Sequence, residues 1–220
     1  MHYNHRESDP LRIRARKVIA QSLELVRQSN ALQIATAAML ERFDETIERK
    51  DYYPPETQSF APGNPHSLLD WAVRAALRIT NADKANIQLL TSHGALEIVA
   101  QSGFSQEFLD YFACVHEGES ACGNALKNHE RVIVEDVTES AVFHHTTALE
   151  VLLDANVRAV QSTPLIDSSG RILGVLSTHW SSPCRLSGQD FRQVELLART
   201  VVNSLVCNHR EASLHLRLEQ

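Results

Sequence analysis

Hydrophobic positions in the first fifty residues recur with the seven-residue period of a helix that packs along one seam. The seam positions are Leu11, Val18, Leu25, Leu32 and Met39. Asp9 and Pro10 fit the N-cap and first position of such a helix, and no later glycine or proline interrupts it before residue 51. Positions four residues further along are mostly small or polar, so only one of the two seam positions in each heptad is consistently apolar. The pattern predicts a long N-terminal helix within residues 1–50 that forms a homodimer.

A proline-rich segment follows this helix. Residues 51–66 hold four of the chain's seven prolines, which exclude both a regular helix and an interior strand. We therefore predict a linker over 51–66, a folded domain over 67–207 and a helical tail over 208–220.

The predicted domain alternates between helical and strand patterns. A helix begins near Ser67, and further helices are expected over 107–112, 120–127 and 149–155. Strands are expected over 85–90, 96–101, 131–134, 160–166 and 172–180. Turn residues at 92–94 and 167–170 join two pairs of these strands, which predicts an antiparallel meander. Ser187 and Asp190 resemble a capping box at the start of the last helix.

Composition narrows the class of protein. The 220 residues are 43% hydrophobic with a formal charge of −6, which suits a globular core and argues against a nucleic-acid partner. No apolar run could cross a membrane and no signal peptide begins the chain, so we expect a cytoplasmic protein. Its four cysteines form no CxxC pair, and its eleven histidines form no metal motif, which leaves only a single haem ligand open. The sequence names no cofactor.

Several strings together resemble a GAF domain over roughly residues 67–207. They are ANIQLL, IVAQSGFSQEFLDYF, ACGNAL, RVIVEDV, VRAVQSTPLIDSSGRILGVLSTHW and FRQVELLARTV. The resemblance implies an α/β (α+β) fold with an antiparallel sheet of about six strands flanked by helices. It also implies a sensory or regulatory role in bacterial signal transduction. The family holds its ligands between one sheet face and the helices and loops that cover it.

Polar side chains within apolar strands are the candidates for that ligand site, because a buried polar group needs a partner. They are Asn86, Gln88, Gln161, Thr163, Ser177, Thr178 and His179. Strand alternation places Ser177 and Thr178 on opposite faces, so one of the two is misassigned unless a bulge intervenes. Hydrogen bonds among these groups, or exposure to solvent, would account for them equally well.

Cys122 is a further candidate, because it lies in the first turn of a predicted helix, where a thiolate is stabilised. The string ACG also occurs in the GAF-type free methionine sulfoxide reductases, although only Cys114 lies near it here. A buried packing role is the favoured interpretation of Cys122. We therefore expect no enzyme activity, with a thiol-dependent reductase as the alternative.

The sequence thus predicts a sensor that binds a small molecule, or responds to redox state, and passes the signal through dimer helices. Its output partner would be a histidine kinase or another signalling protein. A dimerisation scaffold with a filled cavity remains the alternative outside the ligand-binding class.

Overall fold

The computed structural model describes residues 65–218, and the side chains of residues 68–207. The predicted N-terminal helix with its dimer seam, and the linker up to residue 64, lie outside the described residues. Within residues 65–218, no helix is both long and apolar enough to span a membrane.

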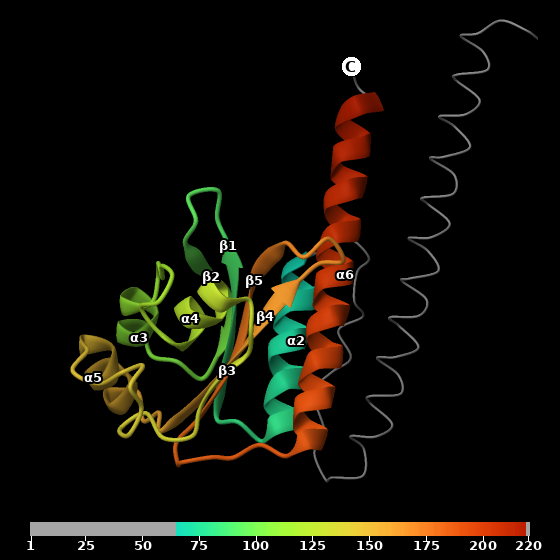
Figure 1. The fold of residues 1–220 in the computed structure, drawn as a ribbon. Coiled ribbons are helices and arrows are strands. Elements are labelled where there is room, and N and C mark those ends of the chain that lie inside the picture. Colours follow the sequence, from blue (N-terminus) through green and yellow to red (C-terminus); the bar gives the residue numbers. More distant parts are fainter. Residues whose placement is uncertain (1–64, 219–220) are drawn as a thin grey trace, which may run out of the picture. The chain divides into compact units, whose positions relative to one another are not determined.

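A five-stranded sheet forms the centre of this part of the chain (Figure 1). Its strands are β1 (Lys84–Leu90), β2 (Leu96–Ser102), β3 (Val132–Val134), β4 (Ala159–Ile166) and β5 (Ile172–Trp180). They lie in the order β2-β1-β5-β4-β3, and every neighbouring pair is antiparallel. The predicted α+β class with an antiparallel sheet is confirmed, with five strands instead of about six.

The predicted meander is wrong in one respect. Its two hairpins, β1–β2 and β4–β5, are present. However, β1 pairs with β5 across the centre of the sheet, which separates β2 from β3 by the whole sheet width. This pairing joins segments about ninety residues apart, and no turn sequence marks it.

Helices cover both faces of the sheet (Figure 1). One face packs against α2 (Pro65–Thr80) and α6 (Gly188–Leu218), which also pack against each other. The other face packs against α4 (Ala121–Asn128), and α3 (Gln106–Tyr111) and α5 (Thr147–Asp154) lie on the same side. The central strands are therefore buried on both sides, which leaves little difference in hydrophobicity between their two faces.

Local sequence signals fix the ends of the helices that border the sheet. The Ser120 side chain caps α4 by accepting a hydrogen bond from the Gly123 amide. At the start of α6, the Ser187 amide donates to Asp190 Oδ2 and the Asp190 amide donates to Ser187 Oγ, which confirms the predicted capping box. The helix then runs unbroken to Leu218, so residue 207 falls within one continuous helix.

Candidate functional site

A small cavity lies between the sheet and the helices α3, α4 and α5. It has a volume of about 20 Å³, enough for the centre of one water-sized group. Its apolar wall comes mainly from the covering side and includes Phe108, Phe112, Phe143 and Leu152. Its polar lining comes from β1, β4, β5 and the start of α4, and comprises Asn86, Gln88, Ser120, Cys122, Ser162, Ser177 and His179.

Three polar residues form a row across the centre of the sheet. Ser177 of β5 lies in register with Asn86 of β1 on one side and with Ser162 of β4 on the other. The Ser162 and Ser177 hydroxyls are 2.8 Å apart and hydrogen-bond to each other. The polar floor of the cavity is thus built on three neighbouring strands of the backbone ladder.

Four buried polar atoms on this face have no hydrogen-bond partner within the part of the chain that the structure describes. They are Asn86 Oδ1, Gln88 Oε1, Gln88 Nε2 and His179 Nδ1. All three residues line the cavity and are at most 5% exposed. A buried polar group without a partner destabilises a fold by about 1–3 kcal/mol, so this grouping does not serve folding stability.

His179 reaches the cavity as a neutral imidazole. Burial, and to a lesser extent the positive charge of Lys84, lowers its pKa to about 3. The ring also lies edge-on to Phe104 and Phe108, with centroid distances of 5.0 Å and 6.0 Å. It therefore offers a hydrogen bond without a charge at neutral pH.

Cys122 lines the cavity from the first turn of α4. Its sulfur lies 2.9 Å from the Ser120 hydroxyl, and both residues are buried. Burial raises the pKa of the Cys122 thiol, although hydrogen bonds from Ser120 and the Gly123 amide, and a weaker interaction with the Gln88 side chain, act in the opposite direction. The desolvation of this site thus outweighs the helix N-terminus that the sequence suggested as an activator. Cys114 is exposed and does not line the cavity.

The structure brings five of the eight predicted ligand-site residues to the cavity: Asn86, Gln88, Cys122, Ser177 and His179. It corrects the placement of the other three. Gln161, Thr163 and Thr178 are buried but do not line the cavity. The alternation of β4 was assigned the wrong way round, because it is Ser162, between Gln161 and Thr163, that faces the cavity.

Two polar lining residues were missed by sequence reasoning. Ser162 could have been found from its register with Ser177, but that register depends on long-range strand pairing. Ser120 was overlooked because its position before a helix is fully explained by capping.

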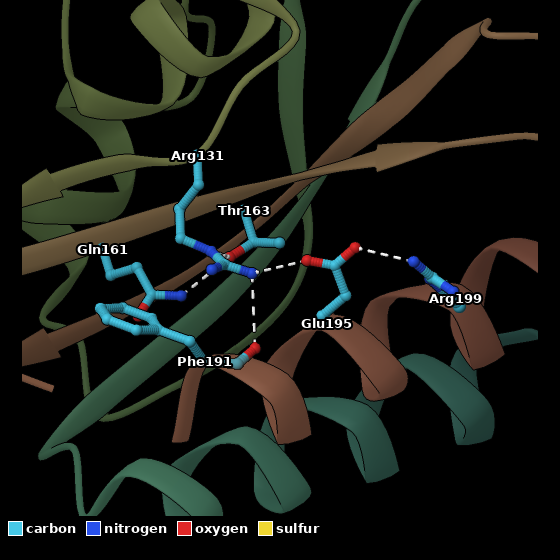
Figure 2. Close-up of polar contacts among 6 residues, drawn as sticks. All are labelled: Arg131, Gln161, Thr163, Phe191, Glu195 and Arg199. Carbon is cyan, nitrogen blue, oxygen red and sulfur yellow. Dashed lines mark hydrogen bonds and ion pairs between the residues drawn. The ribbon is translucent and has the colours of Figure 1, made fainter. Parts of the chain in front are cut away.

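Gln161 and Thr163 belong to a separate hydrogen-bonded network that lies between β4 and α6 (Figure 2). Gln161 Nε2 donates to Thr163 Oγ1 at 2.8 Å, and Arg131 Nε donates to the same oxygen at 3.3 Å. Arg131 also reaches α6, where its Nη2 atom is 3.0 Å from Glu195 Oε2 and 3.4 Å from the Phe191 carbonyl oxygen. The network links the β4 strand to the start of the terminal helix.

A larger open hollow, of about 350 Å³, borders this network between β4 and α6. Its charged lining is already paired, because Glu195 bridges Arg131 at 3.0 Å and Arg199 at 3.1 Å. We therefore place the candidate site in the smaller cavity, where unpartnered atoms converge. Over the described part of the chain, no three His, Cys, Asp or Glu side chains gather in a group that could hold a metal ion.

A five-stranded antiparallel sheet covered by helices on both faces defines an α+β domain. The GAF domain family model matches residues 63–206, so the chain belongs to the GAF domain family. This confirms the resemblance found in the sequence. No curated protein matches this sequence.

Solved structures of low sequence identity share the fold. A domain described as part of a two-component sensor histidine kinase from Sinorhizobium meliloti 1021 is 20% identical, with a TM-score of 0.57, over 71% of this chain and 99% of that one. The GAF domain of a phosphoenolpyruvate-protein phosphotransferase from Coxiella burnetii is 15% identical, with a TM-score of 0.61, over 81% of this chain and 96% of that one. A free methionine-R-sulfoxide reductase from Neisseria meningitidis, solved with its substrate, is 14% identical, with a TM-score of 0.56, over 78% and 89%.

Proposed function

We propose that this GAF domain is a sensory module that binds a small molecule in the cavity and has no catalytic activity of its own. The observation that carries the proposal is the convergence of the four unpartnered atoms of Asn86, Gln88 and His179 on one cavity. Such a cluster weakens the ligand-free fold and is compensated when a ligand supplies hydrogen bonds. The occurrence of the same fold in a sensor histidine kinase protein supports the signalling role.

The size of the cavity couples binding to a change of shape. A volume of about 20 Å³ accepts no organic ligand without movement of a wall. The sheet floor is fixed by its ladder, so the movable wall is the side formed by α3 and α4. A ligand that binds the widened form shifts the population toward it, which is the basis of a sensor.

A route from the cavity to α6 runs through β4. Ser162 faces the cavity, while its neighbours Gln161 and Thr163 face the network that holds α6. A displacement of this strand therefore changes the Arg131 contacts with Glu195 and Phe191. We propose that α6, together with the predicted N-terminal helix of a homodimer, carries the signal to a histidine kinase or other output protein.

Extraction of natively purified protein tests the proposal. We expect mass spectrometry of the denatured extract to find a small molecule in stoichiometric amount from the wild type and not from Asn86→Leu. The Gln161→Met variant, altered on the opposite face, is the matched control and should retain the molecule. A wild-type extract with no bound molecule, in cell extracts and after incubation with metabolite mixtures, would support the scaffold alternative.

Redox sensing and reductase activity at Cys122 form the second candidate, which the fold of the Neisseria reductase favours. The buried thiol with its raised pKa supports a packing role instead. We expect no turnover of free methionine sulfoxide by the wild type in the presence of a thiol reductant. Turnover that is lost in Cys122→Ser would replace the sensor proposal with an enzyme.

A further inference from the structure

We infer that the ligand of this cavity is a neutral, planar heterocycle with an N–H group beside a carbonyl group, the edge found in lactams, recognised by the side-chain amide of Gln88. The inference rests on the proposed function and names the chemical class of the molecule bound.

The lining of the cavity excludes a charged ligand. Its polar groups are amides, hydroxyls, one thiol and the imidazole of His179, and no lysine, arginine, aspartate or glutamate is among them. The imidazole stays uncharged because burial holds the pKa of His179 at about 3. Lys84, in register with His179, lies outside the lining. A carboxylate or phosphate would enter this space without a paired charge, which is strongly unfavourable.

The unpartnered atoms define the hydrogen-bonding edge. Gln88 is 1% exposed, and apart from a weak interaction with the Cys122 thiol, its carbonyl oxygen and its amide nitrogen lack hydrogen-bond partners. A primary amide presents an acceptor beside a donor, so its complement presents a donor beside an acceptor at the same spacing. A lactam has this edge, and it fits in either orientation of the glutamine amide. Asn86 Oδ1 and His179 Nδ1 remain for further polar groups of the same molecule.

The opposite wall selects a flat ligand. Phe108, Phe112 and Phe143 line the cavity and are at most 6% exposed. Phenylalanine rings pack best against planar, weakly polar rings. A ring held between this wall and the polar floor satisfies the strand amides at its edge and the phenylalanines at its face.

A matched series of three probes tests the inference: 2-pyridone, 2-methoxypyridine and the 6-carboxylate of 2-pyridone. The first has the lactam edge, the second has the same ring without the N–H donor, and the third adds a negative charge. Binding is measured by two-dimensional ¹H–¹⁵N NMR, in which the Gln88 side-chain amide signal is identified by its loss in Gln88→Met.

We expect 2-pyridone to shift the Gln88 amide signal and to bind at least tenfold more tightly than either other probe. The loss of one hydrogen bond raises the Kd about tenfold. Gln88→Met should lower the affinity for 2-pyridone by a similar factor, whereas Gln161→Met should leave that affinity unchanged. Equal or tighter binding of the carboxylate or the methoxy compound would overturn the lactam class.

The same class is overturned if no probe binds at millimolar concentration, or if the molecule extracted from the native protein carries a charge. In both cases the proposed sensor function is judged separately. An extracted charged ligand would leave that function standing, whereas the absence of any bound molecule, in cell extracts and after incubation with metabolite mixtures, would remove both.

Discussion

On the face of the sheet that packs against α6, buried Gln161 donates a hydrogen bond to Thr163. Arg131 contacts Thr163 and also Glu195 of α6. On the cavity face, neither end of the buried Gln88 amide makes a well-formed hydrogen bond, and its one polar interaction is a weak one with the Cys122 thiol. The two glutamines are each 1% exposed and lie on interior strands, so burial does not distinguish them. What differs is whether the surrounding chain supplies hydrogen bonds.

On the face packed against α6, Gln161 Oε1 and Thr178 Oγ1 also lack partners among the described residues. These two atoms come from residues that are in register on neighbouring strands. Neither residue lines the cavity, whereas the unpartnered atoms of the other face meet at it. A fold can tolerate a few such atoms, but their convergence on a cavity is typical of a binding site.

The largest expected effect is the pH dependence of the unfolding free energy that His179, on the cavity face, produces. Its folded pKa of about 3 lies below its ordinary value of 6.5, so the unfolded chain binds more protons below pH 6.5 and stability falls as the pH falls. We expect the unfolding free energy to drop by about 2 kcal/mol from pH 7 to pH 5 on account of this group. Urea titrations of the wild type and His179→Asn at both pH values measure it, and an equal drop in the variant would contradict the assignment.

A substitution of Arg131 tests how much the network on the α6 face of the sheet contributes to stability. Replacing it with methionine removes hydrogen bonds to Thr163, Phe191 and Glu195 while keeping an apolar stem. We expect a loss of about 1–2 kcal/mol in the free energy of unfolding, because these bonds involve a charged, partly buried donor.

Arg199→Met is the matched control for this network, since Arg199 binds the same Glu195 but its side chain is 71% exposed. An exposed pair of this kind contributes well under about 1 kcal/mol. Equal losses in the two variants would mean that the contacts of Arg131 with β4 add nothing to stability.

Cys122→Ser should give the smallest effect. The exchange keeps a small side chain next to Ser120 and should change the unfolding free energy by about 1 kcal/mol or less. In the folded wild type, we expect iodoacetamide to modify exposed Cys114 well before Cys122, because burial raises the pKa of the Cys122 thiol. Rapid modification of Cys122, mapped by peptide mass spectrometry, would instead support a redox role.

The helices and strands of the domain were predictable because their signals are local. Turn residues, the caps at Ser120 and Ser187, and alternation within β1 and β5 all come from neighbouring positions. Asn86 and Gln88 follow directly from that alternation, as both lie on one face of β1.

The orientation of β4 could not be predicted in the same way. Gln161, Ser162 and Thr163 are three successive polar residues, and all are at most 4% exposed because helices cover both faces of the sheet. The polar pattern therefore gave no contrast between the faces. The β1–β5 pairing was missed for a related reason, since only long-range packing determines it.

The most direct test of the cavity's role is the free energy of unfolding of Gln88→Met, measured on protein refolded from denaturant without added ligand. Methionine has a similar volume and removes two unpartnered polar atoms, so we predict that the variant is about 1–2 kcal/mol more stable than the wild type. Gln161→Met, which loses the bond to Thr163, should show no such gain. A Gln88→Met variant that is less stable than the wild type would mean that Gln88 serves the fold, and would contradict a ligand site at this cavity.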